Sequence, residues 1–267
     1  MLNVLAGLVS VCLVASSNYA LNEVLDAPTD RMHPQKRHRP IASGVVSSSA
    51  GLVEWIALAI VGLGLAALVS LPFFVSALGL WVMALVYNVP PIRSKEVPYL
   101  DVLSEAVNNP LRMLMGWYMI EVHLIPPVSL VVAYWMLGCF FMATKRLAEY
   151  RHLGGGSRAA DYRGSFAHYD ESRLLVTVMT YATAAAFFLG IFLIRYRMEL
   201  ILSAPLFAVF MGLYLRIGLK PNSPAMNPER LIGQKLLMIW LAVSVGTGVL
   251  LMVVDIPLLA ELFQPTP

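Results

Sequence analysis

The sequence predicts an all-α membrane protein, a polytopic transmembrane helix bundle of about eight spanning helices in a single domain over residues 1–267. Hydrophobic residues make up 58% of the chain and charged residues only 13%, against roughly 25% charged residues in a typical soluble domain. Several apolar stretches have about the 20 residues that a bilayer-spanning helix needs. Because the hydrocarbon core offers no water to the backbone, apolar stretches of this length are expected to be helical.

Eight apolar stretches can be distinguished along the chain. The first contains no charged residue and follows no basic segment, so we interpret it as a membrane helix and not as a signal peptide. Pro72 predicts a turn between the second and the third stretch. The expected spans are residues 1–21, 50–71, 73–88, 99–117, 125–144, 173–194, 198–217 and 233–253.

Lys and Arg gather in alternate connections. The connections after the first, third, fifth and seventh stretches hold four, two, six and four of the 19 bases. Alternate connections lie on the same side of a membrane, and an excess of Lys and Arg marks the cytoplasmic side. We therefore expect an integral protein of the cytoplasmic membrane, with these connections in the cytoplasm.

A periodic polar pattern follows the first apolar stretch. Asn22, Asp26 and Asp30 are spaced i, i+4, i+8 and would form one stripe on a helix, although Pro28 weakens helical geometry there. Carboxylate and amide oxygens are ligands that suit Mg2+. The stripe predicts a magnesium site at the membrane surface, and a solvated helix end with scattered acids is the alternative.

Two basic segments are candidates for binding phosphate. Lys36 and Arg39 follow the acidic stripe directly, and Tyr87, Arg93 and Lys95 lie in "YNVPPIRSK". Cations neutralise phosphate oxygens, and a phenol donates a hydrogen bond to them. The alternatives are a topology signal, a site for anionic lipid, or ordinary cytoplasmic loops.

Residues 22–44, "NEVLDAPTDRMHPQKRHRPIASG", resemble the first aspartate-rich motif of the UbiA superfamily of intramembrane prenyltransferases. That motif reads roughly N-D-x-x-D-x-x-x-D followed by H-P-x-K-x-x-R-P-x-x-S-G, and Glu23 replaces its second Asp. Residues 87–95 resemble the superfamily segment Y-S-x-P-P-x-x-x-K. The resemblance implies Mg2+ held by Asn22, Asp26 and Asp30. It also implies a diphosphate donor bound by Lys36, Arg39, Tyr87, Arg93 and Lys95.

A third segment resembles one branch of the superfamily. Many members carry a second DxxxD motif where this chain has "KRLAEYR", residues 145–151, which is similar to the K-R-x-A-E segment of decaprenyl-phosphate phosphoribosyltransferase-like proteins. "NPERLIGQK", residues 227–235, is similar to the same branch. Lys145 and Glu149 are therefore expected to join Asp26 and Asp30 as catalytic residues. An ordinary i, i+4 ion pair on a helix is the alternative.

Arg112 lies within the fourth apolar stretch, where a charged side chain is costly unless it faces a cavity or a partner. We expect it to bind a substrate phosphate, and a pair with Glu105 is the alternative. Superfamily members usually have nine helices, with one before the acidic motif, so the resemblance implies a bundle that lacks the usual first helix.

The leading hypothesis is a Mg2+-dependent intramembrane transferase that moves a prenyl group from a prenyl diphosphate to an acceptor and releases pyrophosphate. Prenyl transfer comes first because it is the superfamily's broadest activity. The runner-up is phosphoribosyl transfer from phosphoribosyl diphosphate to a polyprenyl phosphate. A third hypothesis is an inactive membrane scaffold or a transporter. The expected partners are an isoprenoid lipid substrate, a phosphorylated donor and membrane lipid, with no nucleic acid.

Overall fold

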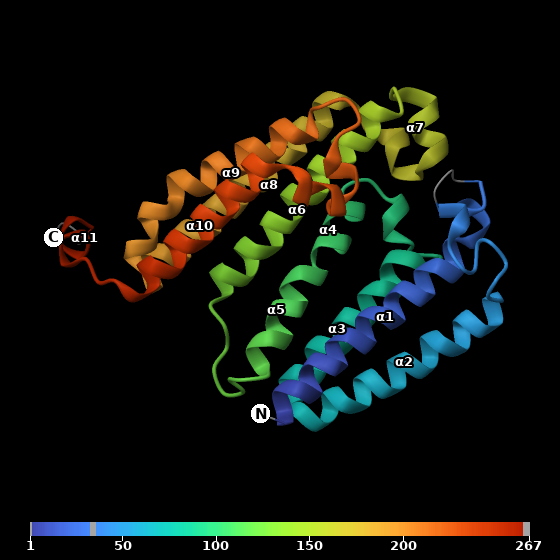
Figure 1. Cartoon of the computed structure of the whole chain (residues 1–267), viewed down its shortest axis with the longest axis horizontal. Helices are drawn as coiled ribbons and strands as arrows, with labels where there is room; N and C mark the ends of the chain where they lie inside the picture. Colours follow the sequence, from blue (N-terminus) through green and yellow to red (C-terminus); the bar gives the residue numbers. More distant parts are fainter. Residues whose placement is uncertain (1, 33–35, 264–267) are drawn as a thin grey trace. The chain divides into compact units, whose positions relative to one another are not determined.

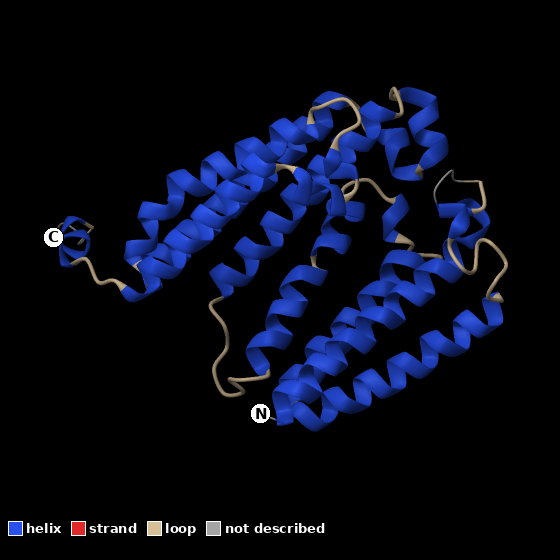
Figure 2. Cartoon of the chain, viewed as in Figure 1, coloured by secondary structure: helices blue, strands red, loops and turns tan. Residues whose placement is uncertain are grey.

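The chain is helical throughout the part that the structure describes. The computed structural model describes residues 2–32 and 36–263, and none of these residues forms a strand (Figure 2). Seven helices within these ranges are long and apolar enough to cross a membrane. The expected all-α fold is confirmed, and the seven helices have the properties of an integral membrane protein. The chain divides into two compact units, Met1–Pro126 and Pro127–Pro267.

The described residues of the first unit form three long helices and a pair of short ones, which Figure 1 labels. α1 packs against α2 and α3, and α3 also packs against α5. α1 continues through Pro28 to Asp30, so the acidic stripe lies on the last turns of a continuous helix. The elements are α1 (Leu2–Asp30), η1 (Lys36–His38), α2 (Ser48–Val69), α3 (Leu71–Asn88), η2 (Ser94–Glu96), α4 (Leu100–Ala106) and α5 (Asn108–Tyr118).

Serine caps define where α2 and α3 begin. The Ser47 hydroxyl accepts a hydrogen bond from the Ala50 N–H at 3.2 Å, and the Ser70 hydroxyl accepts one from the Phe73 N–H at 3.3 Å. Such caps satisfy N–H groups that have no partner within the helix. Ser70 also ends α2, and Pro72 occupies the first turn of α3, where its missing N–H costs nothing. The turn predicted from Pro72 is thus confirmed.

Small residues allow α1 and α2 to approach closely. The Ser10 hydroxyl donates to the Gly62 carbonyl at 2.8 Å, and the Ser17 hydroxyl donates to the Trp55 carbonyl at 2.9 Å. A Cβ atom on Gly62 would lie 2.9 Å from Val14 Cγ2. Close backbone approach with serine hydrogen bonds is how helices associate in lipid, where burial of apolar surface supplies little driving force. This contact fixes the helix that carries the acidic stripe.

The expected fourth span, 99–117, is not one helix. Residues Leu100–Ala106 and Asn108–Tyr118 form two short helices separated at Val107, and neither is among the seven candidate spans. Pro110 provides a reason, because proline has no N–H and is favoured in the first turn of a helix and not in its interior. The expected eight spans therefore become seven long helices and this pair.

The second unit is built around the pairs α6·α8 and α9·α10. Arg197 ties the end of α10 to the start of η4: its guanidinium donates to the carbonyls of Leu251 at 3.2 Å and Val254 at 3.0 Å, and pairs with Asp255 at 2.8 Å. The elements are α6 (Val128–His152), α7 (Gly156–Tyr162), η3 (Gly164–His168), α8 (Glu171–Tyr196), η4 (Met198–Ser203), α9 (Ala204–Gly218), η5 (Pro224–Met226), η6 (Pro228–Gly233), α10 (Lys235–Val253) and α11 (Pro257–Leu262).

Candidate functional site

The last turns of α1 present the acidic stripe. Asn22, Asp26 and Asp30 follow one another at single-turn intervals, as their spacing predicts. The Asp30 side chain is buried, with 5% of its surface exposed, and the Asp26 side chain is 18% exposed. Carboxylates removed from water to this extent require counter-charges.

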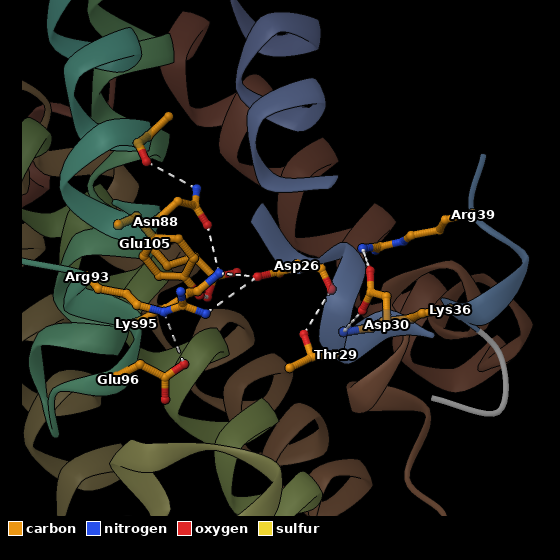
Figure 3. A network of polar contacts seen from close by, with 12 residues as sticks. Asp26, Thr29, Asp30, Lys36, Arg39, Asn88, Arg93, Lys95, Glu96 and Glu105 are labelled. Atoms are coloured by element: carbon orange, nitrogen blue, oxygen red, sulfur yellow. Dashed lines mark hydrogen bonds and ion pairs between the residues drawn. The ribbon is translucent and has the colours of Figure 1, made fainter. Parts of the chain in front are cut away.

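Asp30 receives its counter-charges from the loop that follows α1. Arg39 Nη1 donates to Asp30 Oδ2 at 2.7 Å, and Lys36 Nζ lies 4.0 Å from Asp30 Oδ1 (Figure 3). η1 turns the chain back so that these two bases return to the helix end. His33 and Pro34, which match the superfamily motif, lie outside the described residues.

Asp26 receives its counter-charges from the connection between α3 and α4. Lys95 Nζ lies 2.5 Å from Asp26 Oδ1, and Arg93 Nη2 lies 3.9 Å from the same atom (Figure 3). Lys95 is 7% exposed and also donates to Asn88 Oδ1 at 2.9 Å. Burial lowers the pKa of Lys95, and the hydrogen bond to Asp26 acts in the opposite direction. Asn88 was not identified from the sequence, although it directly follows Tyr87 in the motif.

Tyr87 lies in the same unit and donates its hydroxyl to Glu105 Oε2 at 2.9 Å. Its ring also faces Lys95, whose Nζ is 6.0 Å from the ring centroid. Tyr87 is thus held by a carboxylate of α4 beside the cations that contact Asp26. Arg112 is exposed on α5, and its expected role in binding a substrate phosphate remains a prediction.

The side-chain oxygens at the end of α1 suit a Mg2+ ion that also binds oxygens of a substrate. Asn22, Asp26 and Asp30 offer one amide and two carboxylate groups, and Mg2+ typically takes one or two protein carboxylates together with water and substrate phosphates. Among the described residues, no group of three or more His, Cys, Asp or Glu side chains could hold a metal ion on its own. The two carboxylates face different pairs of bases, and water or a substrate phosphate would complete the coordination of a bound cation.

The segment at 145–149 belongs to the second unit. Arg146 Nη1 lies 2.9 Å from Glu149 Oε2, and the two side chains are 1% and 12% exposed. The pair joins residues i and i+3, so the partner of Glu149 that the structure records is Arg146, and not Lys145 as the i, i+4 alternative assumed. Lys145 is half-buried on the same helix. The catalytic roles expected for Lys145 and Glu149 remain predictions.

Comparison with known proteins supplies the context for this geometry. Residues 1–231 match the model of the UbiA prenyltransferase family. The chain is 34% identical over 142 residues to a decaprenyl-phosphate phosphoribosyltransferase of Mycolicibacterium smegmatis, covering 52% of this chain and 42% of the relative. It is 30% identical over 182 residues to the nodulation protein NoeC of Azorhizobium caulinodans, covering 68% of this chain and 57% of that protein. The chain therefore spans about half the length of these curated relatives.

The fold has a solved counterpart. A UbiA homolog from Archaeoglobus fulgidus bound to DMAPP and Mg2+ matches with a TM-score of 0.72 at 20% sequence identity, covering 95% of this chain and 88% of the homolog. At that identity the match establishes the fold alone. The family match covers most of the chain and includes both basic segments and the acidic stripe. The chain belongs to the UbiA prenyltransferase family.

Proposed function

We propose that the chain is a Mg2+-dependent intramembrane transferase that moves a phosphoribosyl group from phosphoribosyl diphosphate to a polyprenyl phosphate. The observation that carries the proposal is the arrangement in which Asp26 and Asp30 each face two bases at the end of α1. Arg93 Nε also lies 3.6 Å from Glu96 Oε1, so four bases face three carboxylates and one positive charge remains in excess. That excess suits a ligand with several negative charges, such as a diphosphate.

The bases supply the phosphate-binding part of the reaction. Arg39 and Arg93 can each hold phosphate oxygens with two parallel hydrogen bonds, while Lys36 and Lys95 act as point charges. When a diphosphate binds, these bases turn from Asp26 and Asp30 to its oxygens, and the carboxylates become free for a cation. Bound Mg2+ would offset the charge that develops on the departing pyrophosphate. The bases and the carboxylates would thus have partners of opposite charge both before and after diphosphate and Mg2+ bind.

The transfer itself balances with the two substrates alone. A phosphate oxygen of the lipid acceptor forms a bond to C1 of the ribose, and the bond from C1 to the diphosphate oxygen breaks. Pyrophosphate leaves with the bonding electron pair. Groups already aimed at the leaving oxygens stabilise this step because they need no reorganisation as charge develops. The apolar helices would provide the environment for the lipid acceptor, and the excess of Lys and Arg in alternate connections supports a reaction on the cytoplasmic side.

The choice of donor rests on the second unit. Where many UbiA-type proteins carry a second acidic motif, this chain has Lys145, Arg146 and Glu149, and Arg146 pairs with Glu149 at 2.9 Å. A carboxylate held by a buried guanidinium is a poor candidate for a second metal ligand. The name of the Mycolicibacterium relative supports the same donor. This order reverses the one expected from the sequence, where prenyl transfer came first.

Prenyl transfer from a prenyl diphosphate is the second candidate. The family description and the fold shared with a homolog that binds DMAPP and Mg2+ support it. It uses the same exchange of partners at Asp26 and Asp30, and it differs in the group that C1 belongs to and in the acceptor.

A two-donor assay tests the proposal. Purified protein in liposomes containing polyprenyl phosphate is incubated with Mg2+ and either ribose-labelled phosphoribosyl diphosphate or chain-labelled prenyl diphosphate. For the prenyl donor, an aromatic acceptor is added, and product is separated from donor chromatographically. We expect ribose label in the lipid phase with the wild type and not with Asp26→Asn. New product from the prenyl donor alone would establish the second candidate, and no product from either would contradict a transferase function.

A further inference from the structure

A second stripe runs along the end of α1 beside the acidic one. Glu23 and Ala27 on α1, and Arg31 directly after its end, are spaced i, i+4, i+8. Each lies one position after Asn22, Asp26 or Asp30, which turns this stripe by about 100° around the helix axis. Ala27 is buried. This face therefore has a packing partner.

The partner is the loop that carries Arg39. The Ile41 N–H donates to Glu23 Oε1 at 2.9 Å, and Arg31 Nε donates to the Ala42 carbonyl at 3.3 Å. Ile41 and Ala42 are both buried. The second stripe thus holds the loop backbone at two consecutive residues, two and three positions after Arg39.

The loop has internal hydrogen bonds that carry this anchorage to Arg39. The Ser43 N–H donates to the Arg39 carbonyl at 2.8 Å, and the Val46 N–H donates to the Pro40 carbonyl at 3.0 Å. Arg39 is therefore part of a compact turn whose centre, Ile41, is fixed by Glu23. From that turn its side chain reaches Asp30 at 2.7 Å.

We propose that Glu23 is a positioning residue that sets where Arg39 meets a bound diphosphate, and that it is not a metal ligand. The proposal rests on the proposed function for its diphosphate ligand. It accounts for glutamate at a motif position where the superfamily usually has aspartate, since the additional methylene extends the reach of the carboxylate toward the loop backbone. In this proposal the two neighbouring stripes have different roles. The stripe with Asp26 and Asp30 binds the cation, and the stripe with Glu23 holds the basic loop.

Three variants separate positioning from ligation. Glu23→Gln keeps an oxygen that accepts from Ile41 N–H but is a weaker metal ligand, whereas Glu23→Ala removes the acceptor. Glu54→Ala, an exposed glutamate on α2, is the matched control. The readouts are hydrogen exchange of residues 36–46, pyrophosphate affinity by calorimetry with Mg2+ present, and Mn2+ affinity by electron paramagnetic resonance with pyrophosphate present.

We expect Glu23→Ala to increase exchange in residues 36–46 and to weaken pyrophosphate binding by about tenfold, the order of effect of losing one charge-assisted contact. Glu23→Gln should stay within about twofold of the wild type in both affinities, a difference smaller than the loss of one hydrogen bond would cause. Combining Glu23→Ala with Arg39→Gln should weaken pyrophosphate binding no further than Arg39→Gln alone, because both changes remove the same contact. Thermal midpoints confirm that each variant is folded.

Loss of Mn2+ affinity in Glu23→Gln as large as in Asp26→Asn would make Glu23 a ligand and overturn the proposal. Unchanged pyrophosphate affinity in folded Glu23→Ala, or full additivity with Arg39→Gln, would also overturn it while leaving the proposed function standing. Failure of the wild type to bind pyrophosphate at all would instead overturn the proposed function, and with it this role of Glu23.

Discussion

Lys95 Nζ lies 2.5 Å from Asp26 Oδ1, although 69 positions separate the two residues in the chain. The contact joins the connection after α3 to the end of α1 and is almost completely buried on the lysine side. Lys95 therefore occupies the carboxylate that a divalent cation would use. A cation bound alone must displace it, whereas a cation that arrives with a diphosphate gives Lys95 a new partner. Binding of the two ligands should be mutually favourable.

The first prediction concerns this exchange. Lys95→Gln should bind Mn2+ alone about tenfold more tightly than the wild type, and pyrophosphate with Mg2+ about tenfold more weakly, since one charge-assisted contact is removed in each case. Titrations by electron paramagnetic resonance and calorimetry measure the two affinities. Lys220→Gln, at an exposed position in the second unit, is the control. Equal Mn2+ affinity in Lys95→Gln and the wild type would show that Lys95 does not compete with the cation.

The second prediction concerns the two carboxylates. Asp26→Asn and Asp30→Asn should each lower turnover by about 100-fold or more, because the change removes a charged ligand and takes one carboxylate from the partners of two bases. Membrane insertion should be unchanged, since both residues lie on the last turns of the candidate span Asn3–Asp30, after the uncharged stretch of residues 1–21. Turnover in liposomes and Mn2+ affinity with pyrophosphate present are the measurements. Asp161→Asn, an exposed residue of α7, should behave as the wild type. Full activity in Asp26→Asn would show that Asp26 is not a required ligand of the divalent cation.

Much of this site could be predicted because local spacing determines it. The stripe of Asn22, Asp26 and Asp30 follows from helical periodicity once the helix is known to continue, and it does so despite Pro28. The pairing of Asp26 with Lys95 could not be predicted, because no local pattern says which carboxylate a base 69 positions away will contact. Family likeness placed both segments at one site, and only the packing of α1 against α3 decides the partners.

The roles of Glu23 and Glu149 show a second limit of sequence reasoning. Glu23 was interpreted as a mild departure from a motif, yet its carboxylate accepts from a backbone N–H, a contact that leaves no trace in residue patterns. Glu149 lies at i+4 from Lys145 and at i+3 from Arg146, and both spacings bring side chains together on a helix. In the structure Glu149 pairs with Arg146, and the Arg146 side chain is buried. The stretch expected as one helix at 99–117 is interrupted at Val107, a break that hydropathy does not register.

The third prediction compares two ion pairs with the same length and different burial. Arg146–Glu149 and Arg151–Glu171 both measure 2.9 Å, but the first pair is 1% and 12% exposed and the second 40% and 50%. Glu149→Ala should lower the free energy of unfolding by about 3 kcal/mol, because it removes the carboxylate that pairs with a buried guanidinium at 2.9 Å. Glu171→Ala should cost less than about 1 kcal/mol. Denaturation in detergent micelles measures both, and similar costs would show that Arg146 finds a replacement partner.

The fourth prediction tests the close contact of α1 with α2. A Cβ on Gly62 would meet Val14 Cγ2 at 2.9 Å and the Val14 backbone nitrogen at 3.1 Å, while a Cβ on Gly64 would meet nothing within 4 Å. Because backbone atoms cannot turn aside as a flexible side chain can, Gly62→Ala should cost about 2 kcal/mol of stability by overpacking. Gly64→Ala, two residues away on α2, should be neutral or stabilising, since alanine favours a helix by about 1 kcal/mol over glycine. Thermal unfolding in detergent compares the two, and an equally stable Gly62→Ala would mean that α1 can move away from α2, in which case the acidic stripe is held less rigidly than this packing indicates.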